Sequence, residues 1–308
     1  MTMPSANIVK KCSPDFLLVD NEVKSINKSN EVLILSSIDA WNSLDWTKKY
    51  FDGKPKGGYF IWVKKQVNFP LSTCVNIASM KIKQDLQNLM VIEKGIKAKA
   101  NIVCSSLKSN LSGTHKARGK LILKDGASLE YNHIHKWGSN DNVYPDYEFI
   151  LGTGASLDYN YLNMFPPKDL NIKNKIICGD NSSVNLSIAV NGIDSNIKIK
   201  EEVLLKGKGS QAISRLKLVG RKNANIVAES SIIATEKSKG HIDCQSLMID
   251  NKSKISSIPL LVCENKDAQI THEASIGKVS EEQLNYLRAR GLNEKQAIDL
   301  IVSGFLKA

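Results

Sequence analysis

The residues best suited to hold a metal lie between Ser238 and Gly277. This stretch contains Cys244, His272 and Glu273, and so combines a soft thiolate with an imidazole and a carboxylate. Thiolate and imidazole ligands suit iron and zinc, whereas carbonyl and water ligands suit magnesium and calcium. The stretch therefore predicts an iron or zinc site that uses Cys244, His272 and Glu273. In an extended strand the last two face opposite ways, unless the chain turns at Thr271.

Two other histidines form a weaker candidate site. His133 and His135 occur in LEYNHIHKW, where strand alternation places both side chains on one face. Two imidazoles at positions i and i+2 can chelate a metal, but exposed strand histidines are commoner, so we expect the pair to be exposed. His241 and Cys244, at i and i+3, face opposite ways in a strand, and we do not expect them to share a metal.

The remaining cysteine pattern indicates reduced thiols. The chain of 308 residues has six cysteines, namely Cys12, Cys74, Cys104, Cys178, Cys244 and Cys263. They form no CxxC pair and are spaced too widely for a small disulfide-linked domain, so each is by default a small buried residue.

The opening MTMPSANIVKK lacks the apolar stretch of a signal peptide, and no later segment is apolar enough to span a membrane. We expect a cytoplasmic protein with no membrane contact.

The formal net charge of +11 raises the question of nucleic-acid binding. The lysines, however, are spread along the chain singly and in short pairs such as Lys10-Lys11 and Lys64-Lys65. No RNP, helix-turn-helix or zinc-finger pattern accompanies them. The charge therefore indicates a solvated basic surface, and no nucleic-acid partner is expected.

A weak repeat runs through the middle of the chain. A small residue followed two positions later by an aliphatic residue recurs at Ala100, Ala127, Ala155, Ser182, Ser195, Ala224, Ser253 and Ala268. The intervals are multiples of about 14 residues, and such a fixed period is typical of a stacked solenoid. Each coil would place the small residue at an inward corner and the aliphatic residue on the next strand. The repeat predicts an all-β core, a parallel β-helix over residues 57–278.

The two ends of the chain differ from this core. Residues 1–56 are expected to form a short N-terminal α/β segment, with a helix within 36–52 capped by Ser37. Residues 279–308 predict two helices. Ser280 and Gln283 form a capping box, the first helix ends at Gly291, and Asn293 caps the second, with Ala297, Leu300, Ile301 and Phe305 on one face. This helical pair is either an end cap of the solenoid or a docking element for a partner.

The C-terminal part of the chain resembles the SufB/SufD family. Four blocks within residues 239–306 follow the family pattern, namely HIDCQSL, IPLL, HEASIGK and EEQLNYLRARGLNEKQAIDLIVSGF. Weaker similarity extends upstream through GGYFIWVKKQVNFPLSTC. The resemblance implies a right-handed β-helix that pairs with a second SufB/SufD-type subunit. It also implies terminal helices (280–306) that engage a SufC-type ABC ATPase, and a transient iron–sulfur cluster near the subunit interface.

The same resemblance assigns roles to residues. Cys244 takes the place of the key assembly cysteine, with His272 and Glu273 at the family's histidine and glutamate. Cys104, in ANIVCSSL, takes the place of a candidate sulfur acceptor, although the family's flanking Glu-Gly and Ala-Pro are missing here. We expect the cluster site to be shared across a dimer, with His272 of one copy nearer Cys244 of the other. The short N-terminal segment resembles compact archaeal proteins of this family, which implies a homodimer.

The predicted function is a scaffold, not an enzyme, on which clusters are assembled for apo-proteins. The chain has no GxxxxGK(S/T) loop, so ATP hydrolysis would belong to the partner. One alternative is a cluster-free SufD-like adaptor, which would lack the cysteine found here as Cys244. Another is a polysaccharide-active β-helix enzyme, which would need a secretion signal and a groove of Asp or Arg residues that the sequence does not contain. Cluster nuclearity and the sulfur donor stay open.

Overall fold

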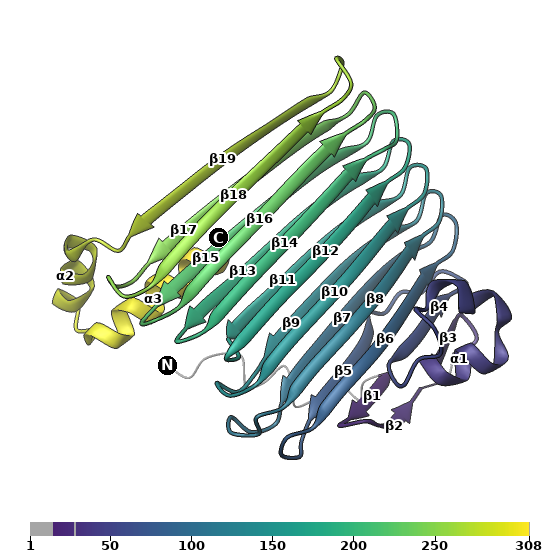
Figure 1. The fold of residues 1–308 in the computed structure, drawn as a ribbon, viewed down its shortest axis with the longest axis horizontal. Coiled ribbons are helices and arrows are strands. Elements are labelled where there is room, and N and C mark those ends of the chain that lie inside the picture. The colour runs from purple at the N-terminus through teal and green to yellow at the C-terminus, as the bar shows by residue number, and fades with distance from the viewer. Residues whose placement is uncertain (1–14, 28, 308) are drawn as a thin grey trace.

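A computed structural model describes residues 15–27 and 29–307, and the chain is built mainly from β-strands (Figure 1). Cys12 and the other residues of the first 14 lie outside this description. The strands form one sheet of ten and one of nine. Successive strands from β4 onward alternate between the two sheets, and from β6 onward each strand pairs in parallel with the strand two before it. The predicted parallel β-solenoid is confirmed.

The strand bounds follow the order of each sheet. The ten-stranded sheet contains β19 (Gln269–Lys278), β17 (Lys239–Met248), β15 (Gln211–Arg221), β13 (Ser183–Ile193), β11 (Ser156–Phe165), β9 (Ser128–Lys136), β7 (Lys97–Ser106), β5 (Leu71–Ile77), β1 (Phe16–Val19) and β2 (Glu22–Ile26). The nine-stranded sheet contains β18 (Lys254–Cys263), β16 (Asn225–Ala234), β14 (Asn196–Leu205), β12 (Asp169–Cys178), β10 (Asn142–Leu151), β8 (Thr114–Leu123), β6 (Lys83–Ile92), β4 (Tyr59–Val63) and β3 (Val32–Ser36).

The register of the coils explains the repeat in the sequence. Ser128 of β9 pairs with Ser156 of β11, 28 residues further on, and their hydroxyls hydrogen-bond at 2.8 Å. One coil thus contains two of the repeats seen in the sequence.

The small residues expected to face inward are at most 6% exposed, so their burial is confirmed: Ala100, Ala127, Ala155, Ser182, Ala224 and Ser253. The expectation of a single ladder is wrong. Ala127, Ala155 and Ser182 stack at one corner, Ala224 and Ser253 stack at another, and Ala100 lies within β7 opposite Tyr131. Gly126 and Gly154 precede Ala127 and Ala155 with φ of 66° and 65°, a left-handed turn that glycine adopts without strain.

The N-terminal segment extends both sheets. β1 pairs in parallel with β5 and antiparallel with β2, and β3 pairs antiparallel with β4. The expected helix is present as α1 (Ser37–Ser43), followed by the 3₁₀ helix η2 (Asp45–Tyr50). Its cap is Ser36 rather than Ser37. The Ser36 hydroxyl accepts a hydrogen bond from the Asp39 amide at 3.0 Å, whereas Ser37 is buried and donates to the Gln87 carbonyl.

The two C-terminal helices begin and end where the sequence predicts. α2 (Glu281–Ala289) has the Ser280–Gln283 capping box and is followed by Gly291 at φ 90°. α3 (Glu294–Lys307) is capped by Asn293, whose side-chain oxygen accepts from the Gln296 amide at 2.9 Å.

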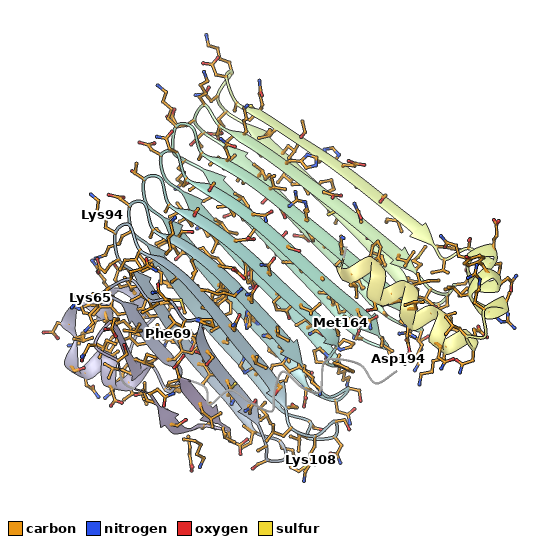
Figure 2. All side chains as sticks on the ribbon, turned by 180° about the vertical axis from the view of Figure 1, so that it is seen from behind. Lys65, Phe69, Lys94, Lys108, Met164 and Asp194 are labelled. Atoms are coloured by element: carbon orange, nitrogen blue, oxygen red, sulfur yellow. The ribbon has the colours of Figure 1, made fainter. Side chains whose placement is uncertain are left out.

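α3 packs on the outer face of the ten-stranded sheet, near Met164 in Figure 2. Val302 and Leu306 are buried there against Ala189 and Val219. An ion pair of 3.0 Å between Arg221 and Asp299 ties the helix to β15. The N-terminal elements and the C-terminal helices lie at opposite ends of the solenoid (Figure 1). Within the described ranges, no helix is long and apolar enough to cross a membrane.

The corner formed by Ala127, Ala155 and Ser182 predicts a specific cost of enlargement. Ala155→Leu should lower the free energy of unfolding by about 1–3 kcal/mol, because the corner is fully packed and extra methyl groups force the coils apart. Ser183→Leu, at an exposed outward position, is the control and should change stability by less than about 0.5 kcal/mol. Urea unfolding measures both variants. Equal stabilities would show that this corner is not tightly packed.

Candidate functional site

Cys244 points into the solenoid near its C-terminal end. It lies on β17 opposite Leu216 of β15 and Ala274 of β19, and is 2% exposed. Burial raises the pKa of its thiol, and the nearby Ser257 and Ser230 hydroxyls offset part of that rise. Only the last coil separates this thiol from the end of the solenoid.

The structure brings His272, but not Glu273, to the side of the sheet that Cys244 faces. β19 is a continuous strand without a turn at Thr271, so the two neighbours face opposite ways. His272 pairs with Ile242 and shares the inward face, one strand and two residues from Cys244, which is roughly 8 Å between Cα atoms. Glu273 pairs with Asp243 on the outward face, and both residues of β19 are exposed.

The end of the solenoid beside Cys244 is open. β18 and β19 are the last strands of their sheets, so each leaves one edge unpaired within the described chain (Figure 1). On β19, Ile276 is 48% exposed, and on β18 Ile258 and Leu260 are 49% and 54% exposed. An unpaired edge with exposed aliphatic residues is a template for another chain. Cys244 therefore lies one strand beneath a surface suited to a partner.

A buried carboxyl group lies close to Cys244. Glu201 points inward from β14, and its Oε2 accepts hydrogen bonds from the Ser214 hydroxyl at 2.8 Å and the Ser230 hydroxyl at 3.3 Å. Its Oε1 has no partner within the described residues. Burial raises the pKa of this carboxyl to about 7. The sequence analysis missed Glu201, although in NIKIKEEVLL it alternates in phase with Ile197 and Ile199.

His133 and His135 lie in the interior rather than on the surface. They share one face of β9, as predicted, but are 0% and 1% exposed, so the expectation of exposure is wrong. Leu129 and Tyr131 are inward, and alternation carries the two histidines with them. Burial lowers the pKa of His133 to about 3 and that of His135 well below its usual range.

Cys104 lies beside these imidazoles. Its Sγ is 3.6 Å from Nε2 of His133, and burial raises the pKa of the thiol. Cys104 is on β7 and Cys244 is on β17, five strand steps away in the same sheet, or about 24 Å at ~4.8 Å per step. The two cysteines thus belong to separate parts of the interior.

His241 is separate from both groups, as predicted. It faces outward, opposite in phase to Cys244, and its Nδ1 hydrogen-bonds with the Thr271 hydroxyl at 2.8 Å. Among the described cysteines, four are free thiols, namely Cys104, Cys178, Cys244 and Cys263.

The described residues thus form a parallel β-solenoid with an inward thiol beneath an open sheet end. A family model described as "SUF system FeS cluster assembly, SufBD core domain" matches residues 77–305. The chain therefore belongs to the SufBD family of iron–sulfur cluster assembly proteins.

Curated relatives agree with this assignment. A SufBD family iron–sulfur cluster assembly protein of Methanothermobacter thermautotrophicus (strain Delta H) is 29% identical over 255 residues, which cover 81% of this chain and 62% of that protein. One from Archaeoglobus fulgidus is 28% identical over 321 residues, or 96% and 85%. One from Staphylococcus saprophyticus is 26% identical over 280 residues, or 88% and 58%. The chain thus covers less than two thirds of the length of the Methanothermobacter and Staphylococcus relatives.

Glu201 predicts a pH-dependent stability. The folded protein raises the pKa of this carboxyl from its ordinary value of 4.5 to about 7, so folding favours the protonated form. That stabilisation is fully present below pH 4.5 and is lost as the pH rises through 7. Between pH 5 and pH 8, the unfolding free energy of the native protein should fall by about 2–3 kcal/mol more than that of Glu201→Gln.

Urea unfolding at the two pH values tests this. Glu202→Gln is the matched control, because Glu202 is the next residue and faces outward. That variant should keep the pH dependence of the native protein. Identical pH dependence in Glu201→Gln and the native protein would contradict the raised pKa.

Proposed function

We propose that this chain is the scaffold subunit on which a nascent iron–sulfur cluster is assembled at Cys244. The observation that carries the proposal is an inward thiol one strand beneath an open sheet end, with His272 on the same face. The other ligand group on that face is the imidazole of His272, whereas the carboxylate of Glu273 faces outward and would need β19 to turn at Thr271 in the assembled state. One thiolate with such ligands holds a cluster less firmly than four thiolates, which suits a cargo that must pass to apo-proteins.

The open end supports assembly between two copies of the chain. Pairing through the free edges of β18 and β19 would satisfy their backbone groups and cover Ile258, Leu260 and Ile276. In such a homodimer, His272 of one copy would lie near Cys244 of the other. A SufD-like subunit could take the place of the second copy, since it would need the same complementary edge.

Proton transfer in the proposed site can involve Glu201. Cys244 must lose its proton to bind iron, and burial opposes that loss. The Glu201 carboxylate is hydrogen-bonded to Ser230, whose hydroxyl also lies near Cys244. Because the pKa of the Glu201 carboxyl is about 7, this group is partly ionised at neutral pH, and its carboxylate form can accept a proton.

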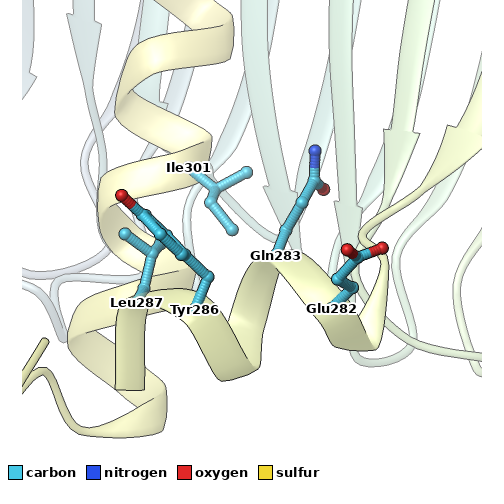
Figure 3. A pocket seen from close by; sticks show the side chains of 5 residues that line it. All are labelled: Glu282, Gln283, Tyr286, Leu287 and Ile301. Atoms are coloured by element: carbon cyan, nitrogen blue, oxygen red, sulfur yellow. The ribbon is translucent and has the colours of Figure 1, made fainter. Parts of the chain in front are cut away.

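The C-terminal helices support docking of a SufC-type ABC ATPase, which would supply ATP hydrolysis. Figure 3 shows a shallow pocket between α2 and α3, lined by Glu282, Gln283, Tyr286, Leu287 and Ile301. α2 has no buried residue, and Tyr286 and Leu300 are 59% and 54% exposed. Because α3 already covers the sheet with Val302 and Leu306, the remaining apolar surface of the pair is free for a partner.

Cys104 remains the candidate sulfur acceptor. Its thiolate would attack the outer sulfur of a donor persulfide and release the donor's thiolate. Nε2 of His133 lies 3.6 Å from the Cys104 sulfur, but burial lowers the pKa of this imidazole to about 3, which makes it a poor base for the deprotonation. The competing function is a cluster-free adaptor. The inward Cys244 favours the scaffold, because an adaptor has no need of a thiol at that position.

Cys244→Ala should lose most of the iron bound after anaerobic reconstitution with iron and sulfide, because it removes the only thiolate in the proposed set. His272→Ala should lose less, since water can replace the imidazole, and Glu273→Ala should lose least, because this carboxylate faces outward. Absorption and Mössbauer spectra measure the cluster. Cys178→Ala removes an equally buried thiol elsewhere and should load normally. Full loading of Cys244→Ala would refute the site and leave Cys104 as the next residue to test.

Leu300→Asp should abolish co-purification with a SufC-type ATPase, because it places a charge on the exposed face of α3 without entering the packed core. Phe69→Asp is the control. Phe69 is similarly exposed, at 47%, but lies far from α3 (Figure 2). The circular dichroism spectrum of both variants should match that of the native protein. Retained binding by Leu300→Asp would mean that the helices only cap the solenoid.

A further inference from the structure

Three potential metal ligands converge inside the middle coils of the solenoid. Cys104 Sγ lies 3.6 Å from His133 Nε2, and His133 Nε2 lies 2.9 Å from His135 Nε2. All three ligand atoms lie within 4.8 Å of one another. Among the residues that the structure describes, these are the only three His, Cys, Asp or Glu side chains that converge in this way.

Two of the distances between these atoms can be compared with those of a tetrahedral metal site. Zinc–sulfur and zinc–nitrogen bonds of about 2.3 and 2.0–2.1 Å imply S···N separations of about 3.6 Å and N···N separations of about 3.4 Å. The observed S···N distance of 3.6 Å agrees, and the N···N distance of 2.9 Å needs to widen by a few tenths of an ångström. A small rotation of either imidazole provides that change.

The hydrogen bonds around the cluster orient the imidazoles for this purpose. Nδ1 of His135 is 2.9 Å from the Tyr161 hydroxyl, so its Nδ1–H can donate to that oxygen and leave Nε2 as a lone pair. His133 Nδ1 has no partner within the described residues. Two Nε2 lone pairs 2.9 Å apart repel each other unless a proton or a cation lies between them.

We propose that Cys104, His133 and His135 bind one borderline divalent cation, Zn²⁺ or Fe²⁺, in the interior of the solenoid. One thiolate with two imidazoles suits these ions, whereas Mg²⁺ and Ca²⁺ prefer oxygen ligands. Binding displaces the thiol proton, and the fourth coordination position is left for water.

This site goes beyond the proposed function and is separate from the cluster site at Cys244, although it uses Cys104, the candidate sulfur acceptor. Its ligands lie on β7 and β9, which are about 24 and about 19 Å from β17 and Cys244. Because the ligands are at most 2% exposed, the ion enters while the coils close during folding. The bound ion then links two neighbouring strands, so it stabilises the native protein relative to the unfolded chain.

The test uses the full chain produced in minimal medium supplemented with Zn²⁺, Fe²⁺ or Co²⁺. Elemental analysis should find about one Zn²⁺ or Fe²⁺ per chain. The Co²⁺ protein should show a thiolate-to-cobalt charge-transfer band in the near ultraviolet and the visible bands of tetrahedral cobalt. Cys104→Ser and His135→Gln should each lose most of the metal, and Cys104→Ser should lose the charge-transfer band.

Two control variants assign the ligand. Cys178→Ser removes an equally buried thiol and should keep the metal and the band. Cys244→Ala should also keep both, even though it loses the reconstituted cluster, so failure of this proposal and failure of the scaffold function are distinguishable. If both site variants are insoluble, a band that persists in Cys12→Ser, Cys74→Ser, Cys178→Ser, Cys244→Ala and Cys263→Ser assigns the thiolate to Cys104 by elimination, because these are the other five cysteines of the chain.

Several results would overturn the proposal. Native protein with less than about a tenth of an ion per chain in all three media would do so, as would full metal content in Cys104→Ser. Loss of the ion in Cys244→Ala would show that the ion binds at the cluster site rather than at Cys104. Metal-free protein that takes up sulfur on Cys104 from a persulfide donor would instead favour the acceptor role of this cysteine.

Discussion

The parallel register between successive coils is the constraint on which the rest of the structure depends. Each strand from β6 onward pairs with the strand two before it, so every inward side chain lies above another inward side chain. Strand alternation then decides burial for a whole row at once. Cys244, Glu201 and His133 are inside because Leu216, Ile199 and Tyr131 are inside, and a one-residue slip would expose all of them.

The interior contains more polar groups than stability alone requires. Glu201, His133 and His135 are buried, and Asn163 and Asn174 have side-chain atoms without partners within the described residues. Burial of such groups costs free energy unless they are hydrogen-bonded, so an aliphatic interior would make a more stable solenoid. These residues therefore indicate chemistry or ordered water in the interior rather than packing.

The sequence predicted the fold better than the contents of its interior. The small-residue period placed Ala127 and Ala155 at inward corners, and the capping box at Ser280 placed α2. The sequence did not predict that Cys104 lies beside His133, because paired residues in that coil, such as Asn101 and Asn132, are 31 residues apart instead of 28. Extra residues in one turn shift the register by an amount that no local pattern reveals. Glu201 was overlooked for a different reason, since a charged residue is rarely expected in the inward phase.

The two ends of the solenoid differ in a way that limits where assembly can occur. At the N-terminal end, β2 and β3 pair antiparallel with their neighbours, and Trp46 packs against Phe60 and Trp62 beside them. At the C-terminal end, the described chain leaves the outer edges of β18 and β19 without strands. Cys104 is enclosed by coils on both sides, whereas Cys244 has only β19 beyond it in its sheet. A group that must gain and release a cargo needs access to the outside, and a group that holds a permanent ion does not. The position of each thiol along the solenoid thus matches a different task.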